Sequence, residues 1–231
     1  MHHFFVDTAP ANRAVVTGEQ ARQIATVLHL QPGERITLVA DRTAHEVVLE
    51  SVAATEVTGR VIKRRPLATE LRFNLTLGLP LLKGDRSEEI VEAVSQLGVS
   101  RIVPFTSSRS VARELSAGKL ERWQRIAREA AETAHRAIVP RIDPLTGWDE
   151  LFDRLTGRIV VCWEAEEHAS LIEAAAGDDI SLVIGPEGGL TLEEIGVARE
   201  HHAVIVSLGL RTLRAETAAI AAVAVLAARR E

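Results

Sequence analysis

The sequence predicts a two-domain protein in which a small β-rich domain, residues 1–68, precedes a larger α/β domain, residues 71–231. Short apolar runs separated by turn residues fill the first part of the chain. From Leu71 onward, apolar runs of strand length alternate with amphipathic runs of helical length, which is typical of a parallel sheet covered by helices. The chain has 231 residues, 46% of them hydrophobic, so it can form a sizeable core.

In the first domain, strands are expected at 35–40, 45–52 and 59–64, because apolar residues alternate there or run in short pieces. Residues 19–30 have the pattern of one helix, and the Pro-Gly pair that follows them marks a turn. Pro66 and its polar neighbours predict a short linker. A compact β-barrel fits these elements.

In the second domain, strands are expected over five apolar runs, at 71–80, 99–105, 158–163, 181–184 and 204–208. One helix is expected at 87–97, since Gly98 is a good C-cap, and a second at 117–137, with Trp123 on its apolar face. A third, rich in alanine, begins at Arg214. The sequence shows no internal repeat and no low-complexity tract.

The formal net charge of −5 argues weakly against nucleic-acid binding, but an average over the chain hides local clusters. A solvated helix face would explain any one cluster. Several clusters on an acidic chain favour an RNA-binding track. The clustered residues are Arg60, Lys63, Arg64 and Arg65, then Arg101, Arg109 and Arg113, then Lys119, Arg122, Arg125 and Arg128.

Other features of the composition limit where the protein is expected to be located and which cofactors it is expected to bind. Cys162, the only cysteine, lies in an apolar run, which indicates a core residue and fits a reducing cytoplasm. No signal peptide is expected, and the apolar run 218–228 is shorter than the ~20 residues that span a bilayer. No metal is expected, because the eight histidines lack the ligand spacing of a zinc site.

The most informative segment is LVIGPEGGLTLEEI, residues 182–195, which predicts a buried strand, a glycine turn and a helix. The glycines allow positive φ and a close approach of a ligand, and Thr191 with Glu194 matches a capping box. Glu187 would repel a pyrophosphate, and the loop lacks P-loop spacing. The loop therefore suits a ligand without phosphate that has adenosine and amino-acid parts, such as S-adenosylmethionine; a tight turn without a ligand is the alternative.

A second loop follows the strand at 204–208 and runs through residues 209–213 into the helix that begins at Arg214. IGPEGGL followed by SLGLRTLRAET resembles the RsmE family of the SPOUT superfamily, bacterial methyltransferases that modify N3 of a uridine in 16S ribosomal RNA. The resemblance extends to LPLLKGDRSEEIVEAVSQLGVSRIVPFTSSRSV at 79–111, to MHHFFVD at the N-terminus and to VLHLQPGERITL at 27–38.

The resemblance implies a PUA-like RNA-binding barrel followed by a methyltransferase domain with a deep trefoil knot and a parallel sheet. It also implies a homodimer, built on the C-terminal helix, that acts on 16S rRNA of the small ribosomal subunit. Three loops would hold S-adenosylmethionine. The cofactor-binding residues it implies are Leu79, Gly185, Pro186, Glu187, Gly188, Gly189, Leu208, Gly209, Leu210, Leu213 and Thr217.

The expected reaction is an in-line displacement at a sulfonium, which needs positioning but neither a metal nor a covalent nucleophile. Uridine N3 carries a proton near neutral pH. Glu216 can accept this proton directly or through water, and Arg214 can stabilise charge on the uracil oxygens. Glu216 also has a simpler interpretation as a first-turn acid that the helix dipole favours.

Six residues are assigned to RNA: His29, Lys63, Arg64, Lys83, Arg109 and Arg136. The chain departs from the family pattern at several of the positions that face RNA or pack helices. His29 replaces an arginine, Ala93 replaces a lysine, Leu210 replaces a proline, and residues 132–136 read ETAHR. The cofactor loops match better, so these departures bear on RNA contacts more than on the reaction.

Two alternatives remain open at this stage. One is a SPOUT methyltransferase with another RNA target, such as a ribose 2′-hydroxyl. The other is an RNA-binding protein with an inactive methyltransferase domain, against which the retained Arg214, Glu216 and glycine loop argue.

Overall fold

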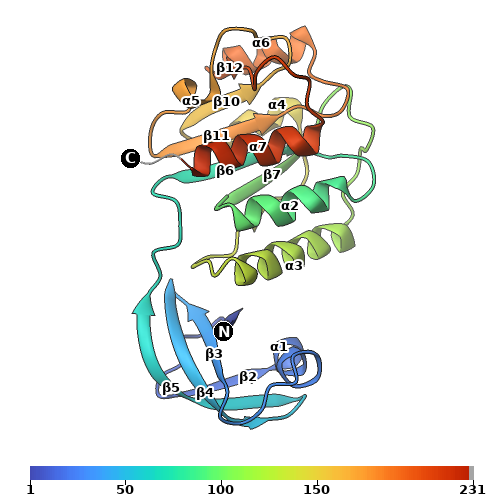
Figure 1. Cartoon of the computed structure of the whole chain (residues 1–231). Helices are drawn as coiled ribbons and strands as arrows, with labels where there is room; N and C mark the ends of the chain where they lie inside the picture. The colour runs from blue at the N-terminus through green and yellow to red at the C-terminus, as the bar shows by residue number, and fades with distance from the viewer. Residues whose placement is uncertain (229–231) are drawn as a thin grey trace. The chain divides into compact units, whose positions relative to one another are not determined.

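The computed structural model describes residues 1–228, which form two compact units (Figure 1). The first unit contains Met1–Glu70 together with Ala131–Ile138, and the second contains Leu71–Ala130 and, of the described residues, 139–228. Residues 131–138 were expected in the second domain, 71–231. They cluster with the first unit because Arg136 pairs with Glu70, and because its carbonyl oxygen lies 3.0 Å from Nε2 of His3.

The first unit is built on a five-stranded sheet with strand order β1-β3-β4-β5-β2. β1 pairs with β3 in parallel, and the other pairings are antiparallel. Its core residues include Phe4, Ile24 and Leu38. The strands are β1 (His2–Phe5), β2 (Arg13–Thr17), β3 (Arg35–Ala40), β4 (Thr43–Val52) and β5 (Glu56–Pro66).

The three strands predicted for this unit are confirmed, while β1 and β2 were not predicted. The helix predicted at 19–30 is shorter in the structure. It consists of α1 (Gly18–Arg22) and a π-helical turn, Gln23–Val27, and the chain then reaches His29 with a φ of 52°. Positive φ is costly for a residue with a Cβ, and it ends the helix before Leu30.

The second unit contains a seven-stranded sheet in which every pairing is parallel, so the predicted parallel α/β sheet is confirmed. The strand order is β12-β10-β11-β6-β7-β8, with β9 also paired to β7. All five predicted strands are present, and the two-residue strands β8 and β9 were missed. The strands are β6 (Asn74–Pro80), β7 (Arg101–Thr106), β8 (Arg141–Ile142), β9 (Thr146–Gly147), β10 (Arg158–Cys162), β11 (Asp179–Ile184) and β12 (Val204–Val206).

Helices cover both faces of this sheet, which explains why its strands are continuous apolar runs. Alternate residues of one strand enter different cores: Leu182 packs with α2, α3 and α7, whereas Val183 packs with α4 and α6. The helices are α2 (Arg86–Gln96), α3 (Ala117–Thr133), α4 (Trp148–Leu151), α5 (Leu171–Ala174), α6 (Leu192–Glu200) and α7 (Ala215–Ala227), with a 3-10 turn at Phe152–Arg154.

The predicted helix at 87–97 corresponds to α2, and Gly98 follows it with a φ of 105°, as a C-cap glycine should. The helix predicted at 117–137 ends earlier, at Thr133, because His135 has a φ of 54°. Among residues 1–228, no helix is both long and apolar enough to cross a membrane.

Because the strands of the second unit are parallel, their carboxyl ends share one edge of the sheet. The segments that follow β10, β11 and β12 therefore converge there. Crevices at this edge are where open α/β sheets bind ligands.

Candidate functional site

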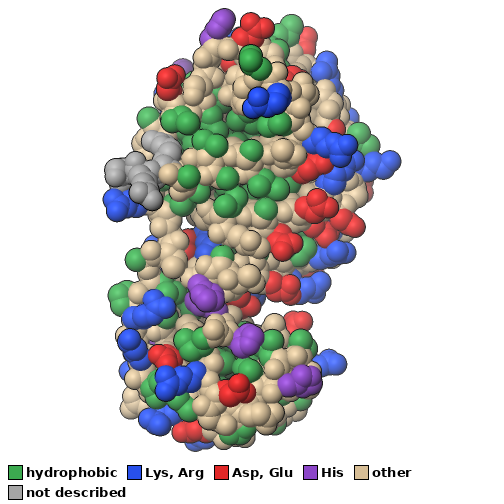
Figure 2. Space-filling view, viewed as in Figure 1, with side chains coloured by type: hydrophobic (Ala, Val, Ile, Leu, Met, Phe, Trp, Pro, Cys, Tyr) green, Lys and Arg blue, Asp and Glu red, His purple; other side chains and the backbone are tan. Residues whose placement is uncertain are grey.

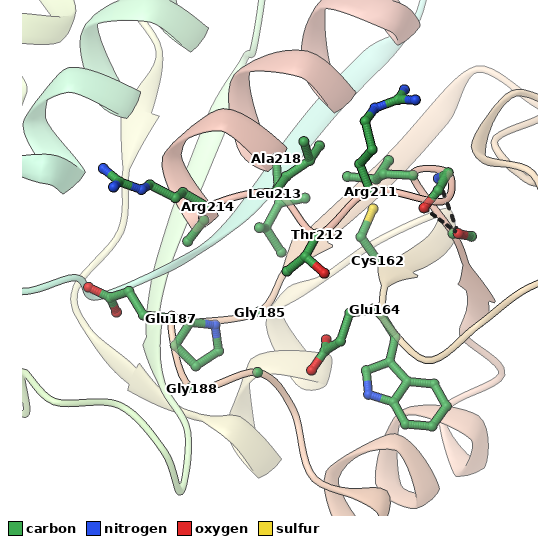
Figure 3. Close-up of a pocket in the computed structure, with 18 of the residues that line it drawn as sticks. Cys162, Glu164, Gly185, Glu187, Gly188, Arg211, Thr212, Leu213, Arg214 and Ala218 are labelled. Atoms are coloured by element: carbon green, nitrogen blue, oxygen red, sulfur yellow. Dashed lines mark hydrogen bonds between the residues drawn. The ribbon is translucent and has the colours of Figure 1, made fainter.

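A cavity of about 900 Å³ lies at this edge of the second unit (Figure 3). Its volume falls within the range of ligand pockets. Three segments contribute most of its wall: the end of β10, the glycine loop after β11, and the loop between β12 and α7. The lining residues are Arg86, Cys162, Trp163, Glu164, Ile184, Gly185, Pro186, Glu187, Gly188, Gly189, Ser207, Leu208, Gly209, Leu210, Arg211, Thr212, Leu213, Arg214, Ala215 and Ala218.

The glycines of the loop after β11 have distinct roles. Only Gly189 has positive φ, at 69°, and its amide donates to the Pro186 carbonyl at 2.9 Å. Gly188 instead allows another segment to come close: a Cβ added there would lie 2.9 Å from Cβ of Arg109 and 3.2 Å from its carbonyl oxygen. The expectation that all three glycines serve positive φ is therefore corrected for Gly185 and Gly188.

The capping box predicted after this loop is present. The Glu194 amide donates to the Thr191 hydroxyl at 3.2 Å, and the Thr191 amide donates to Oε2 of Glu194 at 2.8 Å. The Glu194 carboxylate also binds a second segment, since its Oε1 accepts a hydrogen bond from the Ser108 amide at 2.7 Å. Arg109 also donates to the Gly188 carbonyl at 3.0 Å. The segment after β7 is thereby attached both to α6 and to the glycine loop.

The loop between β12 and α7 forms the facing wall. Its turn is held by the Gly209 amide, which donates to the Ser207 hydroxyl at 3.1 Å, and Gly209 has a φ of 102°. Leu213 is half-buried and Leu210 is fully exposed. Leu208 and Leu213 therefore offer the cavity a half-buried apolar surface, whereas the Leu210 side chain is in solvent.

Two of the residues assigned to the cofactor do not line the cavity. Leu79 is 0% exposed and packs in the core of the second unit, because the carboxyl end of β6 is covered there. Thr217 lies in the first turn of α7 and is exposed. The other nine assigned residues are brought together around the cavity.

The proposed catalytic residues lie at the start of α7. Arg214 is the N-cap residue and lines the cavity, and its side chain is exposed. Glu216 does not line the cavity, but its Oε2 is buried and has no hydrogen-bond partner within residues 1–228. A buried oxygen in that state keeps its full capacity to accept a proton or a hydrogen bond.

Sequence reasoning missed several cavity residues. Arg86 lies 3.2 Å from Glu187, so the glycine-loop carboxylate has a cation beside it. Three more lie at the end of β10 or directly after it: Cys162 is its last residue, and Trp163 and Glu164 follow. The loop after this strand was not considered as part of a site. The rule that ligands bind beyond the carboxyl ends of parallel strands was the signal that could have identified them.

The thiol of Cys162 is a cavity residue but an inert one. It is 7% exposed, and desolvation by burial raises its pKa to about 12. A thiol with so high a pKa is almost entirely protonated near neutral pH, so it is a poor nucleophile. The expectation that Cys162 is a buried core residue is confirmed. Within residues 1–228, no group of three or more potential metal ligands comes together.

The residues assigned to RNA divide between the two units. His29, Lys63 and Arg64 are exposed in the first, and Lys83 and Arg109 are exposed in the second. Arg136 differs, because it is 2% exposed and its Nε donates to Glu70 at 3.2 Å. A buried guanidinium held by a carboxylate is not available to a phosphate, so Arg136 is reassigned to holding residues 131–138 in the first unit.

Comparison with known proteins places this geometry in a family. Residues 69–227 match the model of an RNA methyltransferase domain. The chain is 32% identical to "Ribosomal RNA small subunit methyltransferase E" of Bacillus subtilis, over 91% of this chain and 88% of that protein. It is also 32% identical to the protein of the same name from Mycobacterium bovis, over 98% of this chain and 92% of that one.

Solved structures agree with the sequence relatives. The crystal structure of ribosomal RNA small subunit methyltransferase E from Neisseria gonorrhoeae bound to S-adenosyl methionine is 28% identical and superposes with a TM-score of 0.89, over 98% of this chain and 96% of that one. A putative methyltransferase from Legionella pneumophila in complex with the same cofactor is 26% identical, with a TM-score of 0.89 over 97% and 95% of the two chains. The domain model and relatives that match over nearly the whole length identify the same family, and the cavity fits it. The chain therefore belongs to the ribosomal RNA small subunit methyltransferase E family.

Proposed function

We propose that this protein transfers a methyl group from S-adenosylmethionine to N3 of a uridine in 16S rRNA of the small ribosomal subunit. The observation that carries the proposal is the cavity of the second unit, which two family-specific loops enclose and on whose rim Arg214 lies. The names of the relatives and the cofactor in two related structures support it.

The cavity fits S-adenosylmethionine on three physical counts. Its volume of about 900 Å³ is ample for a nucleoside with an amino-acid chain. Ile184, Leu208 and Leu213 supply an apolar wall suited to adenine. The glycine loop brings backbone close to the space without the lysine of a phosphate cradle. When bound, the cofactor supplies a methyl group on a sulfonium that already carries its leaving group.

The residues of the chain then have to prepare the uracil. Glu216 accepts the N3 proton on its unpartnered Oε2; because this oxygen is buried and Glu216 does not line the cavity, the proton is passed through water rather than directly. Arg214 stabilises negative charge that develops on O2 and O4. The target base has to be unpaired or flipped out of a helix for N3 to reach the cavity.

Analysis of nucleosides by mass spectrometry tests the reaction. Small-subunit rRNA incubated with the protein and S-adenosylmethionine should yield 3-methyluridine, and rRNA incubated without the cofactor should not. A ribose-methylated nucleoside would establish the alternative SPOUT activity. The absence of any methylated product, with RNA still bound, would establish a non-catalytic RNA-binding protein.

Arg214→Ala should lower kcat about 100-fold, the usual effect of removing one charge-stabilising group, while the Kd for S-adenosylmethionine changes little. Glu216→Gln should behave likewise, because an amide cannot take the N3 proton. Single-turnover assays and calorimetric titration separate the two quantities. Arg199→Ala, on the exposed end of α6, is the matched control. Equal losses in kcat and in affinity would show that Arg214 and Glu216 only hold the loop.

The finer architecture is part of the same proposal. We infer that the five-stranded sheet of the first unit is a PUA-like barrel that binds rRNA, with the domain boundary near residues 68–71. We infer a deep trefoil knot in the second unit, as expected for a SPOUT methyltransferase. Family membership supports both, and the exposed Lys63 and Arg64 on β5 support the RNA-binding role. Its substrate would place the protein in the cytoplasm.

We also propose a homodimer that uses α7. This helix buries Ala218, Ala219, Ala222, Val223 and Leu226 in its own unit. Its remaining face is still apolar, since Val225 is 41% exposed and Ile220, Ala221 and Ala224 are partly exposed. Figure 2 shows hydrophobic side chains gathered over α7 on this face of the second unit. An apolar face beside the cavity suits a second copy of the chain.

A further inference from the structure

One carboxylate in the cavity has no role in the mechanism above. Glu164 lies two residues beyond the end of β10 and lines the cavity. It is exposed, and within residues 1–228 no hydrogen bond or ion pair engages it. Glu187, the other acid of the cavity wall, differs because Arg86 lies beside it. Glu164 is therefore an acceptor that faces the ligand space with both oxygens available.

The backbone around Glu164 is well fixed. The Trp163 amide donates to the Val206 carbonyl at 3.0 Å, and the Trp163 indole donates to the Leu190 carbonyl at 3.2 Å. The end of β10 is thus attached to β12 on one side and to the end of the glycine loop on the other. These two contacts hold the backbone from which the Glu164 side chain projects.

The carboxylate lies directly against the glycine loop. A Cβ added to Gly189 would lie 2.1 Å from Oε1 of Glu164, so this oxygen occupies the space that a side chain at position 189 would enter. Figure 3 shows Glu164 reaching toward the loop near Gly188, with Thr212 on the opposite side of the space. Glu187 and Arg214 lie together at the other end of the view. Arg214 and the ion pair of Arg86 and Glu187 therefore lie at one end of the cavity, whereas Glu164 lies toward the other, in the same half of the view as Arg211.

We propose that Glu164 binds the ribose hydroxyls of the cofactor and so selects an intact ribonucleoside; this inference rests on the proposed function. The two neighbouring hydroxyls are donors, and a carboxylate offers two acceptor oxygens to receive them, as acidic residues do for ribose in dinucleotide sites. The amino-acid end of the cofactor carries its own carboxylate. Glu164 would repel that group, whereas Arg214, which lies at the other end beside the ion pair of Arg86 and Glu187, would attract it.

The test measures binding rather than turnover. Calorimetric titrations compare the wild-type protein, Glu164→Ala and Glu164→Gln with the control Glu167→Gln, an exposed acid outside the cavity wall. The probes are S-adenosylmethionine, S-adenosylhomocysteine, its 2′-deoxy analogue, and methylthioadenosine, which has the ribose but no ammonium and no sulfonium. Thermal melting confirms that each variant is folded.

Glu164→Ala should weaken S-adenosylmethionine, S-adenosylhomocysteine and methylthioadenosine equally, by about tenfold or more, the usual loss for hydrogen bonds to a charged group. Removing the 2′-hydroxyl should weaken binding to the wild-type protein by a similar factor but have little effect on Glu164→Ala. Glu167→Gln should bind all four probes as the wild type does.

Three results would overturn the assignment. Unchanged affinity of Glu164→Ala would remove Glu164 from the ligand altogether. A loss confined to S-adenosylmethionine would mean contact with the sulfonium, and a loss absent for methylthioadenosine would mean contact with the ammonium. Failure of the wild-type protein to bind S-adenosylmethionine and S-adenosylhomocysteine would instead contradict the proposed function, and with it this inference.

Discussion

Single side chains in the second unit join the cavity wall to segments that are distant in the sequence. Arg109 donates to the carbonyl of Gly188, which lies 79 residues away. Glu194 binds the amide of Ser108 as well as that of Thr191. These contacts make the conformation of the glycine loop depend on residues 108–109. A substitution in the glycine loop should therefore shift residues 108–109, and a substitution there should shift the loop.

Gly188→Val tests this dependence. The new side chain would meet Cβ and the backbone of Arg109, at 2.9 and 3.2 Å from its first atom, and neither is the flexible end of a side chain. We expect the loop to move and the affinity for S-adenosylmethionine to fall at least tenfold, with the first unit still folded. Calorimetric titration and circular dichroism measure the two effects.

Gly196→Ala is the control for this prediction, because nothing lies within 4 Å of the added Cβ and α6 tolerates alanine. Wild-type affinity in Gly188→Val would mean that the close approach of Arg109 has no bearing on the cavity.

At the scale of elements, α6 shows how a capped helix organises a binding edge. Thr191 and Glu194 satisfy each other's amides at its first turn, and the indole of Trp148 donates to the Glu194 carbonyl at 3.2 Å. The helix start thus contacts α4 and the segment after β7 as well as the glycine loop. The cap supports the cavity wall in addition to the helix.

Thr191→Ala should lower the free energy of unfolding of the second unit by about 1 kcal/mol, the usual effect of losing an N-cap. Glu194→Ala should cost more, about 2 kcal/mol, because it leaves two amides in different segments without their charged acceptor. Urea unfolding followed by tryptophan fluorescence is specific for this unit, since all three tryptophans, Trp123, Trp148 and Trp163, belong to it.

Glu200→Ala, at the exposed end of α6, should leave the unfolding curve nearly unchanged. If Thr191→Ala lowered the free energy of unfolding as much as Glu194→Ala does, the hydrogen bond from the Ser108 amide to Glu194 would contribute nothing to stability.

At the scale of the whole molecule, two properties depend on surfaces rather than on the cavity. One is the proposed assembly through α7, and the other is the proposed binding of an acidic protein to a polyanion. The net charge of −5 opposes the second, so rRNA binding has to come from local clusters such as Lys63, Arg64 and Arg65, all of which are exposed on β5.

The two faces of α7 predict opposite outcomes for two substitutions. Val225→Glu adds a charge to the exposed apolar face, so it should give a folded monomer with little activity. Ala222→Glu should unfold the second unit, because Ala222 is 0% exposed and a buried charge is costly. Sedimentation velocity measures assembly, with Leu192→Glu, 72% exposed on α6, as the control that remains a dimer. A wild-type protein that sediments as a monomer at micromolar concentration would end the dimer proposal.

Changing Lys63, Arg64 and Arg65 together to alanine should weaken rRNA binding and flatten its dependence on salt. The slope of log K against log salt is negative, and each lost phosphate contact reduces its magnitude by roughly 0.7–0.9. Filter binding over a series of salt concentrations gives this slope, and Arg199→Ala is the control. A slope identical to that of the wild type would remove β5 from the RNA-binding surface.

Local patterns in the sequence were sufficient for most of the elements. Strands buried on both faces are continuous apolar runs, a capping box needs only Thr191 and Glu194, and a C-cap needs only Gly98. These signals come from residues within a few positions of one another, so they can be read without a structure. The two cofactor loops were found for the same reason, since each is a short motif between a strand and a helix.

Contacts between distant residues were decided only by the tertiary structure. The burial of Arg136 depends on Glu70, 66 residues away, and the need for glycine at position 188 depends on Arg109. Glu164 faces the ligand space only because β10 lies between β11 and β12 in the sheet. Strand order and close packing bring such residues together, and neither is written in the spacing of a single segment, so the sequence determined the elements and the loops while the fold decided which side chains meet at the cavity.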